Sequence, residues 1–138
     1  RLLQGKELYH INTLVDINNL VSIRHGYSIG GFDRNKIQGD KLILGIGLAN
    51  EPYEGIGRGI INIESLPVYR DAAGGIGTPT SDNERTKMDL GTQHALFLIN
   101  GYDGNRNAVT SCAGDLQALL AKYAQGKDFR LLVEQSQP

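Results

Sequence analysis

The chain has 138 residues, of which 40% are hydrophobic and 21% are charged, and this balance excludes a disordered protein. Its formal net charge of −1 excludes the broad basic surface needed for binding along a nucleic acid, but it is compatible with a local contact to one RNA end. No apolar run reaches the length of about 18 residues that a membrane span requires, so no membrane partner is expected. We expect one compact domain over residues 1–138.

The cysteine content and the N-terminus bear on location. The chain holds one cysteine, Cys112, which cannot form an internal disulfide, so a reducing, cytoplasmic compartment is expected. The sequence begins at Arg1 with an amphipathic segment that lacks the pattern of a signal peptide. We expect that an N-terminal part of the natural chain is missing.

A helix followed by a turn is predicted first. Residues 12–25 carry apolar side chains at the spacing of a helix with one buried stripe. Gly26 is the expected residue after its C-terminus, because glycine adopts the left-handed conformation at no steric cost. Asp33 is expected to cap a short helical turn that Gly39 closes.

Strand candidates fill the middle of the chain. Residues 41–48 alternate, with Gly45 and Gly47 on one face, which leaves room for another backbone or for a ligand. Residues 72–91 hold many turn formers without a clear period, so we expect a long loop, and long loops are often functional. Further short strands are expected at residues 60–63 and 67–71.

The C-terminal part returns to regular elements. The apolar run within residues 92–100 predicts a strand covered on both faces, and residues 101–105 predict a turn. Residues 111–125 predict a helix that ends at Gly126, and residues 128–134 predict a last strand. Helices near both ends with strands between them indicate an α+β fold, with a mixed or antiparallel sheet and flanking helices.

The stretch Gly26–Tyr27–Ser28–Ile29–Gly30 matches G-x-S-x-G, the nucleophile elbow of serine hydrolases. That elbow needs a strand before the serine and a helix after it, whereas here a predicted helix precedes Ser28 and a loop follows. His94, which a triad would need, falls in a predicted core strand. We therefore interpret Ser28 as a turn residue.

Metal and phosphate motifs are not found in the sequence. Asp103, Asn105 and Asn107 imitate the start of a calcium loop, but Gly114 stands where the bidentate glutamate belongs. The three histidines lack ligand spacing, and no P-loop pattern occurs. Neither a metal nor a cofactor is expected.

Residues 15–40, VDINNLVSIRHGYSIGGFDRNKIQGD, resemble the central editing module of the phenylalanyl-tRNA synthetase beta subunit. That family reads V-D-x-T-N-x-V, then G-x-P-x-H-A-F-D, then K-I-x-G. The matching residues are Val15, Asp16, Asn19, Val21, Gly26, Phe32, Asp33, Lys36, Ile37 and Gly39. A second block resembles the family's strand that ends in Asp and is followed by a G-G-I loop, at Asp71, Gly74, Gly75 and Ile76. The similarity covers roughly residues 12–102, and the chain looks like a stand-alone relative of the module.

The resemblance implies a module whose cleft hydrolyses the ester of wrongly charged tyrosyl-tRNA. In the family a glycine loop and a Thr-Asn pair hold the amino-acid end, and a histidine and a glutamate line the pocket. Here Asn19 matches the asparagine, but Asn18 replaces the threonine, Gly30 stands at the histidine position and Leu98 at the glutamate position. Ser28 replaces a family proline. The scaffold of the site is therefore expected, with changed polar side chains.

The resemblance favours binding of a tRNA or aminoacyl-tRNA end, with ester hydrolysis left open and catalytic residues unknown. The candidate lining residues are Asn18, Asn19, Gly30, Asp71, Gly74, Gly75 and Thr78. For Asp71 a structural role in a turn is the favoured interpretation. We expect the turn after the first helix to fold against the glycines near position 75 and to enclose a hollow of amide donors.

Two other function classes stay open. The chain could be a small-molecule binding protein for an amino acid or a nucleotide metabolite, which free ligand would stabilise thermally and to which tRNA would be indifferent. It could also be an interaction module whose ancestral pocket has decayed.

Overall fold

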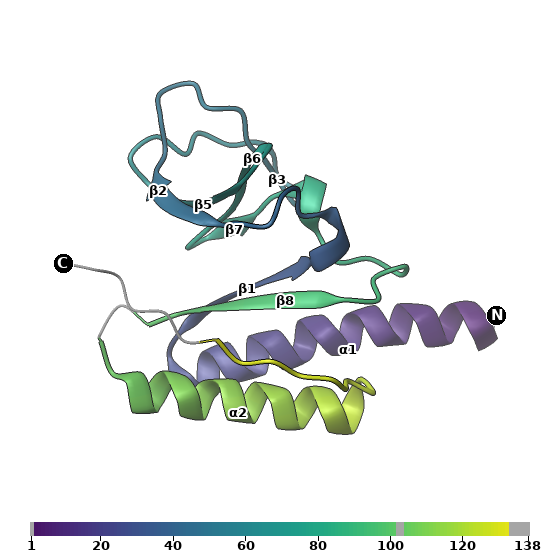
Figure 1. Ribbon diagram of the computed structural model, residues 1–138. Coiled ribbons are helices and arrows are strands. Elements are labelled where there is room, and N and C mark those ends of the chain that lie inside the picture. The colour runs from purple at the N-terminus through teal and green to yellow at the C-terminus, as the bar shows by residue number, and fades with distance from the viewer. Residues whose placement is uncertain (1, 102–103, 133–138) are drawn as a thin grey trace. The chain divides into compact units, whose positions relative to one another are not determined.

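The computed structural model describes residues 2–101 and 104–132. The described residues form long helices and short strands, which makes the protein an α+β protein with antiparallel sheets, as the sequence predicts (Figure 1). The elements in chain order are α1 (Leu2–His25), β1 (Ser28–Asp33), η1 (Arg34–Lys36), β2 (Ile43–Ile46), β3 (Glu54–Gly55), β4 (Gly59–Ile60), β5 (Pro67–Asp71), β6 (Gly74–Thr78), β7 (Ser81–Asp82), η2 (Glu84–Thr86), β8 (Ala95–Asn100) and α2 (Arg106–Tyr123).

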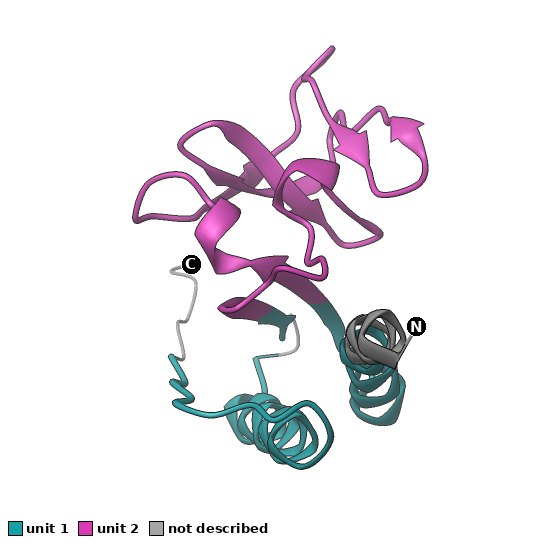
Figure 2. Ribbon diagram, turned by 90° about the vertical axis from the view of Figure 1, so that its right-hand side faces the viewer, with its two compact units in different colours: residues 1–29, 98–138 teal, residues 30–97 magenta. Residues whose placement is uncertain are grey.

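The chain forms two compact units, coloured separately in Figure 2. Unit 1 combines residues 1–29 with residues 98–138, and unit 2 is residues 30–97. β1 and β8 form a two-stranded sheet, and the boundary between the units falls within each of these strands. A single domain over residues 1–138 stays a prediction.

Unit 1 is built on the packing of α1 against α2. The buried side chains of the two helices repeat every three or four residues, as a helix with one apolar stripe requires: Leu14, Ile17, Val21, Cys112, Leu116 and Leu120. Asp115 of α2 binds Arg24 and His25 at the end of α1, with N–O distances of 2.8 and 2.9 Å. The buried stripe predicted for residues 12–25 is therefore confirmed at Leu14, Ile17 and Val21, whereas Leu20 is exposed.

Unit 2 contains a four-stranded antiparallel sheet in the order β2-β5-β6-β7 and a two-stranded sheet of β3 and β4. One part of its core is a cluster of Tyr53, Ile63 and Val68. β2 is an edge strand, and its apolar side chains Ile43, Leu44 and Ile46 are exposed.

The end of α1, the cap of η1 and the turn at Gly39 lie where the sequence predicts them. Gly26 ends α1 with φ of 75°, and its amide donates to the carbonyl of Ser22. Asp33 caps η1 by accepting a hydrogen bond from the amide of Asn35, and Gly39 has φ of 82°. These predictions are confirmed. The sequence could give them because helix caps and stops depend on residues that are neighbours along the chain.

Several element boundaries differ from the expectation. α1 begins at Leu2 and α2 at Arg106, both earlier than predicted. Asn105 caps α2 by accepting a hydrogen bond from the amide of Ala108, and this cap sets its start. The predicted loop over residues 72–91 is wrong, because β6, β7 and η2 lie within it.

The predicted C-terminal strand is also wrong for residues 128–132, which form no strand. Asp128 takes φ of 58° at the start of the segment, and Leu131 and Leu132, which would lie on opposite faces of a strand, are 51% and 85% exposed. Residues 133–134 of that prediction, and residues 102–103 of the predicted turn, lie outside the described residues.

Candidate functional site

β6 is a strand with glycine on one face. Gly75 and Gly77 share that face, since alternate residues of a strand point the same way. A Cβ at Gly75 would lie 3.1 Å from the ring of Tyr53, and a Cβ at Gly77 would lie 2.9 Å from the ring of Phe32. Aromatic rings therefore cover the face of β6 that the glycines leave without side chains.

The segment after α1 reaches this strand. A Cβ at Gly30 would lie 2.9 Å from the ring of Phe32, the same ring that lies against Gly77. The expected proximity of this segment to the glycines near position 75 is confirmed for Gly30. The expected hollow of amide donors stays a prediction; of its expected donors, the amide of Gly74 donates to Asp71 at 3.1 Å.

A carboxylate lies between the two segments. Asp82 pairs with Gly77 across β6 and β7, and its Oδ1 would lie 3.3 Å from a Cβ at Gly77 and 3.4 Å from one at Gly30. The side chain is half-buried, and it accepts a hydrogen bond from the backbone of Gly31. Burial raises the pKa of Asp82 to about 6, and the Gly31 bond only partly opposes this.

Asp71, a predicted site residue at the end of β5, forms hydrogen bonds that join the sheet to η2 and to the segment that follows η1. Its carboxylate binds Arg85 with distances of 2.8 and 2.9 Å and accepts from the amides of Gln38, Ala73 and Gly74. Burial raises the pKa of Asp71, but these bonds outweigh it and bring the pKa to about 2. With so many donors engaged, Asp71 has the surroundings of a structural carboxylate, and a direct contact with a ligand stays a prediction.

Thr78 and Gly75 are also engaged within unit 2. The Thr78 hydroxyl lies 2.9 Å from the Ser81 hydroxyl and accepts from the Ser81 amide at 3.1 Å, which closes the turn between β6 and β7. The carbonyl of Gly75 accepts from the side chain of Asn83 at 2.9 Å. Gly30, Asp71, Gly74, Gly75 and Thr78 thus belong to one unit.

Asn18 and Asn19 belong to unit 1. The side-chain amide of Asn18 donates to the carbonyl of Ile29 at 3.1 Å, which ties α1 to the start of β1, and Asn19 is exposed. The Oδ1 atom of Asn18 is buried and has no partner within the described residues. A shared site that includes these asparagines and the unit 2 residues stays a prediction.

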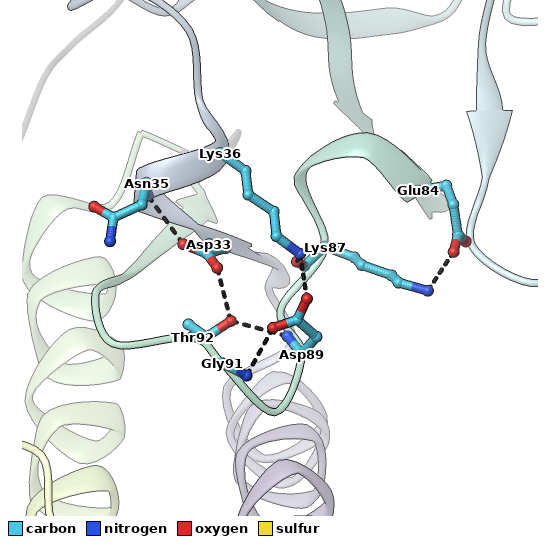
Figure 3. Close-up of polar contacts among 8 residues, drawn as sticks. All are labelled: Asp33, Asn35, Lys36, Glu84, Lys87, Asp89, Gly91 and Thr92. Atoms are coloured by element: carbon cyan, nitrogen blue, oxygen red, sulfur yellow. Dashed lines mark hydrogen bonds and ion pairs between the residues drawn. The ribbon is translucent and has the colours of Figure 1, made fainter.

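The residues around η1 that match the family form hydrogen bonds and an ion pair with other parts of unit 2, as Figure 3 shows. Asp33 accepts from the amide of Asn35 and from the hydroxyl of Thr92, both at 2.9 Å. Lys36 donates to Asp89 at 2.6 Å and to the carbonyl of Lys87 at 2.8 Å. These bonds hold η1 against residues 87–92. Asp33 and Lys36, which match the family's F-D and K-I-x-G motifs, therefore stabilise the fold.

Ser28 opens strand β1 directly after α1 and Gly26, and it is half-buried. A helix precedes it and a strand follows, which is not the strand–turn–helix order of a nucleophile elbow. The predicted loop after Ser28 is a strand, and His94 lies before β8 with an exposed side chain rather than inside a core strand. These positions support the interpretation of Ser28 as a structural residue.

The cations of unit 2 are mostly neutralised. Four of its seven Lys and Arg side chains form ion pairs: Lys36–Asp89, Arg70–Glu51, Arg85–Asp71 and Lys87–Glu84. Within the described part of the chain, no group of three or more acidic, His or Cys side chains is arranged to hold a metal ion. Nor does any described helix have the length and apolarity to cross a bilayer.

The fold and these contacts define an α+β domain with a glycine-rich strand against the segment that follows its first helix. The family model of the B3/4 domain matches residues 1–124, and the chain belongs to this family. The B3/4 domain is the domain found in the editing module of the phenylalanyl-tRNA synthetase beta chain, so the resemblance seen in the sequence is confirmed. No curated protein matches the chain.

Asp82 is the residue that sequence reasoning missed. It stands in Thr80–Ser81–Asp82–Asn83, a run of turn formers, and nothing in that run sets it apart from Asp33 or Asp89. Its burial and its place beside Gly30 depend on the pairing of β6 with β7, which the sequence did not predict.

Proposed function

We propose that this B3/4 domain binds the aminoacylated 3′ end of a tRNA. The observation that carries the proposal is the family match over residues 1–124, because the B3/4 domain is found in the editing module of the phenylalanyl-tRNA synthetase beta chain. A second observation that supports the proposal is the position of the Asp82 carboxylate. It lies beside Gly30, which belongs to the block of residues 15–40 that resembles the family.

The charge distribution favours recognition of the aminoacyl end over the body of the tRNA. Binding along a nucleic-acid backbone requires cations that are available to phosphates, and each neutralised phosphate adds to the salt dependence. The net charge is −1, and most of the cations of unit 2 already face carboxylates. We therefore expect a shallow dependence of affinity on salt, corresponding to about one or two phosphates.

The proposal includes ester hydrolysis as an activity to be measured. In that reaction water adds to the ester carbonyl, the bond to the ribose oxygen breaks, and the products are a free amino acid and a tRNA with a free 3′ hydroxyl. The geometry around Ser28 does not suit a serine nucleophile, so replacement of Ser28 by alanine is expected to leave any hydrolysis unchanged.

The test uses a panel of tRNAs charged with correct and incorrect amino acids, with uncharged tRNA as the control. Binding is measured by filter retention, and hydrolysis by the loss of labelled amino acid. Tighter binding of at least one charged tRNA than of its uncharged form supports the proposal. Equal or absent binding across the panel, together with absent hydrolysis, contradicts it.

A free amino acid is the second candidate ligand, and the same shortage of unpaired cations favours it. It predicts a rise in melting temperature with free amino acids and no effect of tRNA. At a hundredfold excess over Kd, one bound ligand stabilises a protein by about 2.7 kcal/mol, which a thermal melt resolves easily.

A further inference from the structure

Asp82 differs from the other inward-facing carboxylates of unit 2 in its partners. Asp71 is paired with Arg85 and Glu51 with Arg70, at N–O distances of 2.8 and 2.7 Å. Asp33 forms no ion pair with the cations that the structure describes, but it accepts from the Asn35 amide and the Thr92 hydroxyl. Asp82 accepts a hydrogen bond from the amide of Gly31, and it forms no ion pair with any described residue.

The glycines beside Asp82 keep its carboxylate free of crowding. A Cβ at Gly30 or Gly77 would come within 3.4 and 3.3 Å of Oδ1, so any other residue there would place atoms against this oxygen. The ring of Phe32 packs on both glycines, which gives the carboxylate an apolar neighbour. The result is a half-buried carboxylate with no ion-pair partner among the described residues, and such partial burial of a charge is costly unless a cation approaches it.

We propose that the carboxylate of Asp82 receives the α-ammonium group of the ligand. The inference rests on the proposed function, because an aminoacyl ester and a free amino acid both carry this group next to the carbonyl carbon. An ammonium donates charge-assisted hydrogen bonds to a carboxylate, and these are stronger than bonds between neutral groups. The described residues show no metal-binding cluster that would suit a metal cation instead.

The experiment compares an aminoacyl-tRNA with the same tRNA carrying the N-acetylated amino acid, which lacks the positive charge. The wild-type protein is expected to bind the acetylated form about tenfold more weakly or worse, as the loss of a charge-assisted bond implies. Asp82→Asn is expected to bind both forms equally and weakly. Asp40→Asn removes the same charge at an exposed position and is expected to keep the wild-type discrimination.

Two results overturn the inference while the proposed function stands: wild-type protein that binds both forms equally, or an Asp82→Asn variant that still prefers the free ammonium. If the wild-type protein binds no charged tRNA at all, the proposed function fails instead. The ammonium inference is then decided with phenylalaninamide and its N-acetyl derivative. Stabilisation of wild-type protein by the first compound alone, lost in Asp82→Asn, supports it, and its absence overturns it. Melting curves without ligand establish that the variants fold.

Discussion

Asp71 in β5 and Arg85 in η2 are joined by two hydrogen bonds, of 2.8 Å between Oδ1 and Nη2 and of 2.9 Å between Oδ2 and Nη1. The carboxylate is fully buried, whereas the arginine is 32% exposed. Because the same carboxylate also accepts backbone amides from Gln38, Ala73 and Gly74, this pair connects three segments of unit 2.

Asp71→Asn is expected to destabilise the protein by about 3 kcal/mol, because it leaves a partly buried guanidinium without its counter-ion and removes an acceptor from the buried amides. Urea unfolding measures the change. Glu84→Gln breaks the ion pair to Lys87 at a more exposed position, and its unfolding midpoint is expected to stay at the wild-type value. Equal midpoints for both variants would contradict the structural role of Asp71.

The acid side of the stability profile is expected to depend on Asp71. Its folded pKa of about 2 lies below the unfolded value of about 3.9, so the stabilisation is present above pH 4 and is lost as the pH falls from about 4 to 2. A difference of this size corresponds to about 2.5 kcal/mol. Urea midpoints taken between pH 2 and 5 should fall steeply for wild-type protein and less for Asp71→Asn.

Asp82 is expected to act in the opposite direction. Its folded pKa of about 6 lies above the unfolded value of about 3.9, so stability decreases as the pH rises from about 4 to 6 and stays reduced above that. Since the side chain is only half-buried, we expect a cost of about 1–2 kcal/mol. Among the described residues, Tyr53 interacts electrostatically with the Asp82 charge, and burial raises the pKa of Tyr53 to about 12, outside this pH range.

Asp82→Asn is therefore expected to raise the melting temperature above pH 6 and to leave it unchanged near pH 3, where the aspartic acid is mostly protonated in both the folded and the unfolded state. Thermal melts at the two pH values provide the comparison. A variant that is less stable than wild type at neutral pH would contradict the interpretation of Asp82 as an uncompensated carboxylate. Higher stability with weaker ligand binding would be typical of a residue kept for function.

Gly47 is expected to tolerate no side chain. A Cβ there would lie 1.8 Å from the carbonyl oxygen of Ile63, so Gly47→Ala must displace a backbone and is expected to cost about 3 kcal/mol. Gly114→Ala in α2 is the matched control, because a Cβ there meets nothing within 4 Å. That change should stabilise the helix by about 0.5–1 kcal/mol, and urea unfolding of both variants tests the pair.

The Gly47 contact also decides between the two interpretations of the alternating run at residues 41–48. Its glycines were expected to admit either another backbone or a ligand. For Gly47 the neighbour is the backbone of Ile63, and for Gly45 it is the guanidinium of Arg70, 2.6 Å from a Cβ position. Here the spacing of glycines indicated close approach correctly, but only the tertiary structure identified what approaches.

The sequence alone determined the features that depend on neighbours along the chain. The stop of α1 at Gly26, the cap at Asp33 and the buried stripe of Leu14, Ile17 and Val21 follow from local sterics, hydrogen bonding and helical period. The class of the fold and the family resemblance could also be predicted, because they depend on the order of elements and on a contiguous block of residues.

The tertiary structure decided what the glycine-rich middle becomes. Gly-Gly-Ile-Gly-Thr shows no alternation of apolar and polar residues, so the sequence predicted a loop where β6 forms. That strand exists because β5 and β7 pair with it and the rings of Tyr53 and Phe32 cover its glycines. The burial of Asp82 is a product of the same pairing, since desolvation of a carboxylate is set by atoms brought from distant parts of the chain rather than by its neighbours in sequence.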